Sequence, residues 1–433
     1  MDQMRFDELV RKHGIPGASL AVLAAGDVSA LASGVLNLST GVEATTDSLF
    51  QIASITKVYT ATVFMRLVEQ GLVGLDTPVV EVLPDFALAE PGVAQKVTMR
   101  HLLSHTSGIG SDFFRGEWRG DDCVERYVAA CADLGQDVPL GATASYSNAA
   151  FCILGRVIEV LTGLIWDQAV AAHISEPLGL THTWTLPEEV LRFRAAMGHF
   201  ASSATDAPIP APFWELPFRG TGTCGSVSTT ASELIAFARM HLTDPALAVM
   251  REPQAEIPVP AADHWGLGWL LWNWDGREIF GSSGDNPGQS ASLVVVPDAG
   301  VAIALMANSD RFALFQRDVV GELLLELCGI HMPVAPAPLA TPYPVRFPQQ
   351  FVGRYERFGA HVDVTVGEDG ALRLMETQTG DLAGMIPNLE LDLVPVSEGR
   401  FVGCLESGGR WAPVTFTGGR FVYIGLRAAT KTA

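Results

Sequence analysis

The pattern of apolar and polar positions divides the chain into a long mixed part and a shorter part rich in strands. In the long part, helix-like segments lie between two early apolar runs and a later cluster of such runs. The expected helices are 1–15, 55–72, 98–105, 121–134, 149–161, 230–242 and 315–328, and the expected strands are 18–23, 27–34, 266–272, 278–280, 291–296 and 301–308. Strands at both ends with helices between them predict an α+β fold, an antiparallel sheet flanked by helices.

A proline-rich stretch separates the two parts. Six prolines between 333 and 348 predict a stiff, extended linker. Beyond it, short alternating runs with glycine turns predict strands at 361–366, 372–375, 391–394, 414–416 and 421–426. The expected organisation is therefore a domain at 1–332, a linker at 333–348 and a small antiparallel β-barrel or half-barrel at 349–433.

Composition narrows the classes of partner. The chain has 433 residues, 48% of them apolar, with a net charge of −20, which argues against nucleic acid and anionic membranes as partners. No run is long enough to span a bilayer. The N-terminus lacks the apolar core of a secretory signal, so we predict a cytoplasmic location. The oligomeric state is left open.

Cysteine and histidine spacing indicates neither disulfides nor a metal site. The six cysteines form no C-x-x-C pair, which predicts thiols in a reducing compartment. His101 and His105 have the i, i+4 spacing of helical zinc ligands, but no glutamate lies between them and no third ligand is evident. We predict structural roles for both histidines, and no metal or other cofactor.

A serine three residues before a lysine is the first candidate for chemistry. On a helix, Ser54 and Lys57 would share one face. A serine hydroxyl needs a base beside it, and burial lowers the pKa of an amine enough to make it one. Only Lys57, Arg66 and Glu69 are charged between 55 and 72, so the helix is expected to be enclosed by protein. Alone, S-x-x-K is a weak signal.

Two further segments supply complementary groups. Tyr146 and Asn148 would face one pocket if their segment is extended, where the phenol can relay a proton and the amide can bind a substrate or steady the lysine. Alone, Tyr-x-Asn describes any loop tyrosine. In 280–290, Gly284 would let a substrate approach the strand closely, although the same letters also fit a plain turn. Two amides aimed at one oxyanion would favour acyl transfer.

In this order, the motifs resemble those of the class C β-lactamase-type serine hydrolases, a family that includes DD-peptidases, esterases, D-amino-acid amidases and some acyltransferases. The resemblance covers at least residues 10–330 and is specific for the family, though not for one member. It rests on the segments 50–57, 74–79, 98–108, 146–148, 155–159, 225–229 and 288–290. The C-terminal part looks like the lipocalin-like domain that some of these hydrolases carry.

The resemblance implies roles for four residues. Ser54 would be the acylated nucleophile, Lys57 its base partner, Tyr146 a second proton carrier, and Asn148 a contact to substrate and lysine. The family fold is an antiparallel sheet flanked by helices, as in β-lactamases and transpeptidases.

The third motif departs from the family pattern. The family places a cation two residues before the glycine, where this chain has Ser282, followed by Ser283 and Gly284. The amides of Ser54 and Asp285 would form the oxyanion site. A serine can only hydrogen-bond and Asp285 adds negative charge, so donors with a free carboxylate are disfavoured.

These observations favour a serine acyl-enzyme hydrolase acting on an ester or amide of a small molecule or peptide. A cytoplasmic member is not expected to be a β-lactamase or a cell-wall peptidase, whose substrates lie outside the membrane. The first alternative is transfer of the acyl group to an amine or alcohol acceptor, as in relatives that make amides, esters or cyclic peptides in natural-product assembly. The aromatic segment 208–218, Trp265, Trp269 and the C-terminal domain could build its acceptor pocket. The second alternative is a non-catalytic sensor, which Ser282 favours and the retained Ser54, Lys57 and Tyr146 oppose.

Overall fold

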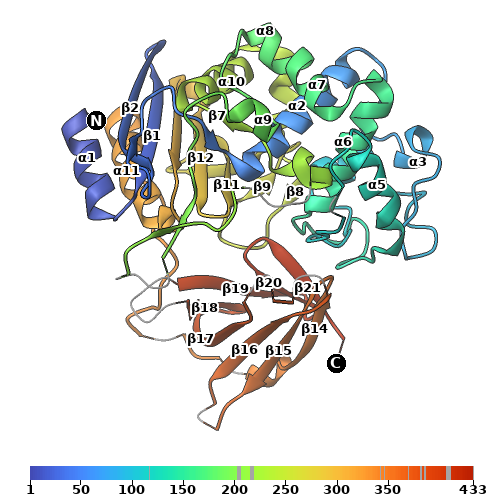
Figure 1. Cartoon of the computed structure of the whole chain (residues 1–433). Helices are drawn as coiled ribbons and strands as arrows, with labels where there is room; N and C mark the ends of the chain where they lie inside the picture. Colours follow the sequence, from blue (N-terminus) through green and yellow to red (C-terminus); the bar gives the residue numbers. More distant parts are fainter. Residues whose placement is uncertain are drawn as a thin grey trace.

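The chain folds into a large part built on one sheet and a separate barrel (Figure 1). The computed structural model describes residues 1–116, 118–201, 206–214, 219–341, 343–345, 347–368, 370–380, 383–384, 387–405 and 411–432. The helices are α1 (Gln3–Lys12), α2 (Thr56–Glu69), α3 (Val79–Val82), α4 (Met99–Leu103), α5 (Cys123–Ala130), α6 (Asn148–Thr162), α7 (Trp166–Val170), α8 (Glu176–Leu178), α9 (Pro187–Val190), α10 (Ala231–Thr243) and α11 (Phe312–Cys328).

The large sheet is antiparallel and has nine strands in the order β3-β2-β1-β13-β12-β11-β10-β9-β8. These strands are β1 (Gly17–Ala24), β2 (Asp27–Asn37), β3 (Val42–Glu43), β8 (Ala255–Glu256), β9 (His264–Trp265), β10 (Leu270–Trp274), β11 (Arg277–Asn286), β12 (Gln289–Val296) and β13 (Val301–Ala307). Strands β1 and β13, from the two ends of the domain, pair inside the sheet, with Leu20 opposite Leu305. This confirms the predicted α+β fold, in which both ends of the domain build one sheet.

Side-chain alternation along the central strands divides the core in two. In β13, Ile303 and Leu305 pack with Phe6 of α1 and Phe315 of α11. The intervening residues, such as Ala304, belong to the larger cluster that includes α2, α6 and α10. Because successive side chains of a strand point to opposite faces, one apolar strand serves both layers. Figure 1 shows α1 and α11 on one side of the sheet and the other helices opposite.

The C-terminal part is a closed eight-stranded barrel in simple up-and-down order. Its strands are β14 (Gly353–Arg357), β15 (Ala360–Val366), β16 (Leu372–Gln378), β17 (Leu389–Ser397), β18 (Arg400–Cys404), β19 (Trp411–Thr417), β20 (Phe421–Ile424) and β21 (Arg427–Lys431). Alternate residues, among them Val362, Leu374 and Phe401, fill its interior. The expected small β domain is confirmed as a closed barrel, whereas its lipocalin-like character and the boundaries at 332 and 348 stay predictions.

One expected strand of the barrel extends two residues too far. The run 421–426 was expected to be continuous, but the chain turns at Gly425, whose φ is +61°, and returns as β21. Alternating apolar residues do not reveal this break because a two-residue hairpin preserves the pattern on both sides. The turn matters because it reaches the candidate site described below.

The barrel packs directly against the large part (Figure 1). Tyr423 and Ala428 of the barrel join an apolar cluster with Ala144, Trp265 and other residues of the large part. The Tyr423 hydroxyl donates a hydrogen bond to the carbonyl oxygen of Ala144 over 3.0 Å. The two parts therefore share a desolvated interface in addition to the covalent linker.

Two findings bear on the composition-based expectations. All six cysteines are described and none is in a disulfide, as predicted. Among the described residues, no single helix is both long and apolar enough to cross a membrane, while one pair, Asn148–Thr162 with Trp166–Leu178, meets the length and composition criteria together despite a 77° bend.

A buried carboxyl group lies at the interface between the two parts. Asp137 accepts a hydrogen bond at Oδ1 from the Phe358 amide over 2.6 Å, and its Oδ2 is buried without a hydrogen-bond partner among the described residues. Burial raises the pKa of Asp137 to about 7, although the Phe358 amide and Arg357 act in the opposite direction. The charged form of Asp137 therefore opposes folding.

We predict that Asp137→Asn stabilises the protein at pH 8 and has little effect at pH 4. Between the ordinary carboxyl pKa of 3.8 and the folded value of about 7, the folded chain retains a proton that the unfolded chain has lost. The free energy of unfolding therefore falls as pH rises through this window, by up to about 4 kcal/mol. Urea unfolding at both pH values measures the effect. The control, exposed Asp133→Asn, should show no such pH-dependent gain, and equal stability of Asp137→Asn and wild type at pH 8 contradicts the prediction.

Candidate active site

Ser54 lies on a short 3₁₀ turn that precedes the long buried helix. The turn η1 (Ala53–Ile55) follows strand β4 (Phe50–Gln51), which pairs with β7 (Ser228–Thr229). Helix α2 begins only at Thr56, so the expected start of the helix at 55 is one residue early. Ala53 has a positive φ of 46°, a strained conformation for a residue with a Cβ, and such strain occurs often at functional sites.

The side chains of Ser54, Lys57 and Tyr146 meet at one oxygen. Lys57 Nζ donates to Ser54 Oγ over 3.1 Å, and the Tyr146 hydroxyl donates to the same atom over 2.7 Å. Lys57 Nζ also donates to the carbonyl oxygen of Cys224 over 2.8 Å. The structure therefore brings together the three residues that the sequence singled out, from segments far apart in the chain.

The pKa of Lys57 is shifted in the direction opposite to the sequence expectation. Burial by itself disfavours the ammonium, but the attraction of Tyr146 and Cys224 in their anionic forms outweighs burial, so the pKa of Lys57 is raised. A hydrogen bond from Cys152 and the charge of Lys57 hold the pKa of the Cys224 thiol near 7. The expected lowering of the Lys57 pKa is not found, because the expectation counted burial and omitted these partners. The role of Lys57 as base partner of Ser54 stays a prediction.

Asn148 is the first residue of helix α6, and Ser147 is its N-cap. The Tyr-x-Asn segment is therefore extended only as far as Ser147, which differs from the expected extended segment. Ser147 Oγ accepts from the Ala150 amide, as serine commonly does at this position. Both functional groups still serve one site, because the Tyr146 hydroxyl binds Ser54 Oγ and Asn148 lines the cavity beside it.

His105 supports this segment from behind. Its Nδ1 accepts from the Ser147 amide over 3.0 Å, and its ring lies 4.7 Å from that of Tyr146. Burial and the charges of Lys57 and Arg427 hold the pKa of His105 well below its usual range, so the ring is neutral. His101 caps α4 together with Thr98. Both histidines make structural contacts, as predicted.

The third motif lies within strand β11. Strand β10 pairs with β11 only as far as Gly281. Residues 282–286 therefore pair with β12 on one side, and their edge on the β10 side is open. Ser282 is buried, whereas Ser283 and Asp285 are exposed. Asp285 accepts from the Ser290 hydroxyl over 2.6 Å. The edge of this strand is thus available beside Ser54, as the sequence predicted.

Gly284 lies against the backbone of the serine turn. A Cβ at this position would come within 2.4 Å of the Ser54 nitrogen and of the Ile52 carbonyl oxygen. No side chain fits in that space, so only glycine lets β11 approach the turn this closely. The close approach brings the strand edge next to the Ser54 amide, where two amides can serve one oxyanion.

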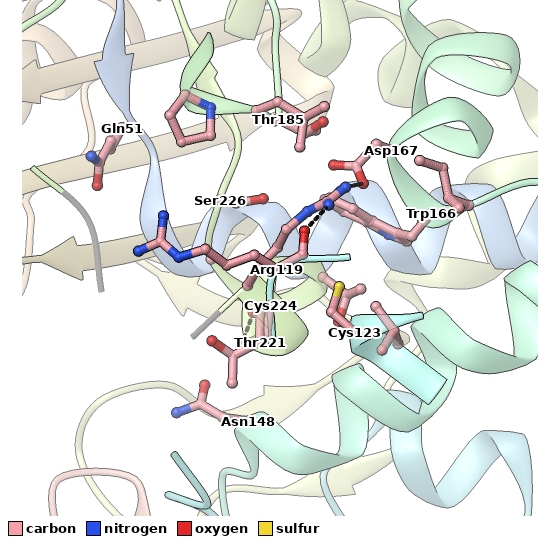
Figure 2. A pocket seen from close by; sticks show the side chains of 18 of the residues that line it. Gln51, Arg119, Cys123, Asn148, Trp166, Asp167, Thr185, Thr221, Cys224 and Ser226 are labelled. Atoms are coloured by element: carbon pink, nitrogen blue, oxygen red, sulfur yellow. Dashed lines mark hydrogen bonds and ion pairs between the residues drawn. The ribbon is translucent and has the colours of Figure 1, made fainter. Parts of the chain in front are cut away.

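A cavity of about 350 Å³ opens beside Ser54. Figure 2 shows Asn148 at one end of it and Trp166 and Asp167 toward the other. Its far end is charged: Arg219 Nη2 lies 3.2 Å from an Asp167 carboxylate oxygen and Nη1 donates to the carbonyl oxygen of Arg119. Asp285 also lines it. The cavity is large enough for the side chain of an acyl donor.

The aromatic residues that were expected to build an acceptor pocket pack in the protein interior or bind other segments. Trp269 is fully buried in the core, and Trp265 is buried against His105 and Tyr146. Trp214 donates from its indole nitrogen to the Ala196 carbonyl oxygen. Pro217 and Phe218, which belong to the expected wall or lid, lie outside the described residues. The wall of the cavity on this side includes 221–226.

Sequence reasoning missed two charged residues that contact this site. Arg427, the first residue of β21, has its guanidinium centre 5.0 Å from the centre of the Tyr146 ring. Asp112 accepts a hydrogen bond from Asn148 Nδ2 over 3.0 Å. Neither belongs to a recognisable motif, and only the hairpin turn at Gly425 brings Arg427 here. Because Ser282 replaces the family's cation, the sequence indicated no cation on β11 near Tyr146. Arg427 supplies one from the barrel instead.

A nine-stranded antiparallel sheet with flanking helices and a serine–lysine–tyrosine cluster is the arrangement of β-lactamase-fold serine hydrolases. The Beta-lactamase family model matches residues 3–324, so the chain belongs to the Beta-lactamase family. The resemblance inferred from the motifs is confirmed at this level.

Proteins similar to this chain carry names that describe different activities or ligands. "Penicillin-binding protein 4" of Amycolatopsis lactamdurans is 47% identical over 372 residues, 82% of this chain and 97% of that protein. The crystal structure of SurE with D-Leu has a TM-score of 0.80 and 27% identity, covering 99% of this chain and 98% of that one. D-amino acid amidase from Ochrobactrum anthropi SV3 has a TM-score of 0.64 and 25% identity, covering 76% and 97%.

We predict that Gly284→Ala lowers activity by about 10²-fold, because its Cβ would displace the Ser54 turn and small misplacements of reacting groups are costly. The measurement is kcat/KM toward an activated ester, alongside thermal unfolding. Gly321→Ala is the matched control, since Gly321 lies in a helix with nothing within 4 Å of the added Cβ. Gly284→Ala with kcat/KM within twofold of the wild-type value would show that the close approach is not needed.

Proposed function

We propose that this protein is a serine hydrolase that forms an acyl-enzyme on Ser54 and acts on an ester or amide of a small molecule or peptide. The observation that carries the proposal is the pair of hydrogen bonds that Lys57 and Tyr146 make to Ser54 Oγ at the mouth of a cavity. Membership of the Beta-lactamase family also supports the proposal.

In the proposed reaction, Ser54 Oγ attacks the carbonyl carbon of the donor. The raised pKa of Lys57 keeps it cationic, so the proton acceptor in this scheme is Tyr146, which enters the step as a phenolate beside the Lys57 ammonium, takes the Ser54 hydroxyl proton and later gives it to the leaving group. The amides of Ser54 and Asp285 stabilise the oxyanion. Water then attacks the acyl-enzyme, and the acid leaves as Ser54 regains its proton. In this scheme Lys57 acts mainly through its charge, a role that differs from that of a neutral base.

The donor is proposed to be a small molecule or peptide that carries a D-configured residue next to the scissile bond. The names of two relatives support this: one is a D-amino acid amidase, and SurE was solved with D-Leu. Ser282 and the exposed Asp285 disfavour a carboxylate on the donor near β11. The proposal includes neither nucleic acid nor a membrane as partner.

We predict that a fluorophosphonate probe labels Ser54 and that Ser54→Ala lowers turnover of an activated ester by about 10⁶-fold. Without the hydroxyl no acyl-enzyme can form. Mass spectrometry of the labelled peptide and steady-state kinetics provide the two measurements, with exposed Ser39→Ala as the control. If wild-type protein takes no label, the enzyme proposal fails and the non-catalytic sensor becomes the better explanation.

Acyl transfer to an amine or alcohol is the second candidate. The observation that favours it is the barrel turn, whose Leu426 carbonyl oxygen accepts from the Tyr146 amide over 2.9 Å. A second domain fastened beside the reacting groups can cover an acyl-enzyme and select its acceptor, provided that it keeps water out.

With a D-alanyl ester as donor, we predict that added primary amines divert part of the product from D-alanine to the amide. Liquid chromatography of both products measures the ratio as amine concentration increases. The L-alanyl ester serves as the control donor and should react at least about tenfold more slowly if the pocket discriminates by one well-placed contact. Free acid as the sole product across all amines rejects the transfer candidate and leaves hydrolysis standing.

A further inference from the structure

A buried carboxylate links the barrel to the candidate active site. Asp112 lies in the loop after α4 and is only 6% exposed. It accepts from Asn148 Nδ2 over 3.0 Å on one side. On the other side it faces two barrel arginines, with Arg427 at 2.8 and 2.9 Å and Arg357 at 3.5 Å. Ser111 adds a hydrogen bond over 3.2 Å.

The charge state of Asp112 determines how the Asn148 amide is oriented. Burial would raise the pKa of Asp112, but Arg427 and Arg357 outweigh burial and hold it below the usual range. An ionised carboxylate only accepts hydrogen bonds. Asn148 must therefore direct its NH₂ group toward Asp112, and its carbonyl oxygen faces away from that partner. A neutral partner that can both donate and accept would not impose this orientation.

The barrel holds the tyrosine segment as well. Leu426 accepts from the Tyr146 amide, and the Ala428 amide donates to Ser145 Oγ over 3.1 Å. Between these two contacts, the Arg427 guanidinium lies over the Tyr146 ring, an arrangement in which a cation attracts the aromatic face. The turn at the start of β21 is therefore fastened to Tyr146, the residue that binds Ser54, and to its neighbour Ser145.

We propose that Asp112 and Arg427 are positioning residues, through which the docked barrel orients the Asn148 amide toward the donor and holds Tyr146 against Ser54. The inference rests on the proposed acyl-enzyme function and adds to it the source of the site's geometry. It makes the barrel a component of the active site, with Asn148 controlled through a carboxylate and Tyr146 controlled directly.

Arg357 has a second partner that distinguishes the two arginines. Its guanidinium also binds Glu376 within the barrel, with Nη2 at 2.7 Å. Among the described residues, the hydrogen bonds and ion pairs of the Arg427 guanidinium go to Asp112 and Ser111, and Glu376 only attracts it from a distance. Arg427 is therefore the residue whose loss separates the barrel's effect on the site from the barrel's own stability.

The test compares two esters in the full-length protein. p-Nitrophenyl acetate has no group that could reach Asn148, whereas the p-nitrophenyl ester of N-acetyl-D-alanine carries an amide beside the scissile carbonyl. In Asp112→Asn, the Asn148 amide can turn, so kcat/KM for the amide-bearing ester should fall by about tenfold or more, the loss expected for one misdirected hydrogen bond. The acetate ester should change by less than about threefold, within the range of a neutral contact.

Arg427 variants test the direct contact to Tyr146. Arg427→Met should lower kcat/KM for both esters, because Tyr146 serves every donor, and Arg427→Lys should recover part of the loss by restoring a cation. Arg354→Met is the control: exposed Arg354 lies on β14 of the same barrel but binds Asp363, at 2.8 Å. It should leave both esters unaffected. Circular dichroism and thermal unfolding verify that each variant is folded.

Two results would overturn the inference. Equal losses for the two esters in Asp112→Asn would mean that Asp112 has only a general structural role. Equal activity of Arg427→Met and wild type would remove Arg427 from the site, and this second variant decides the matter if Asp112→Asn does not fold. Wild-type protein that turns over neither ester instead rejects the proposed function, and this inference falls with it.

Discussion

The close packing of β11 against the Ser54 turn is the constraint on which the site depends. With a Cβ absent at Gly284, the strand lies within contact of the Ser54 nitrogen and Ile52 oxygen. On the other side, β4 and β7 hold the segment that leads into Ala53, whose positive φ the surrounding packing must maintain. The serine therefore sits between a strand edge and the start of α2, and both its hydroxyl and its amide have fixed directions. Because this packing fixes the turn, Lys57 and Tyr146 can both reach Ser54 Oγ.

The charge state of Lys57 is determined more by its neighbouring acidic groups than by its burial. A buried lysine beside neutral groups would lose its proton readily, but Lys57 faces a tyrosine and a thiol that can both become anions, and its pKa is raised. The group is thus better suited to stabilise negative charge next to Ser54 than to accept a proton itself. The Tyr146 oxygen lies nearer to Ser54 Oγ than Lys57 Nζ does, so Tyr146, entering the reaction as a phenolate, is the better candidate to carry the proton.

Much of the fold and the nucleophile cluster could be predicted, because both have local signatures. Helical and alternating patterns located most elements of the large sheet, and S-x-x-K with Tyr-x-Asn pointed to Ser54, Lys57 and Tyr146. These motifs do not reveal which residues from elsewhere in the chain surround the cluster. The hairpin at Gly425 lies inside an unbroken β pattern, and Asp112 has no distinctive neighbours in sequence. The direction of the Lys57 pKa likewise depends on which side chains lie within a few ångströms, which only the fold determines.

The position of Arg427 changes how the departure at Ser282 is understood. A cation on β11 would belong to the same rigid sheet as the serine turn, and its charge would always be present. Arg427 is carried by the barrel, so its positive charge adds to that of Lys57 beside Tyr146 only while the barrel is docked. The same interface contains Asp137, a carboxyl whose pKa burial raises to about 7, so its ionised form opposes the folded contact. The geometry of the site, its charge and the stability of the domain contact are therefore linked through one hairpin and two buried aspartates, and a substitution in the barrel can alter the chemistry of Ser54 without touching it.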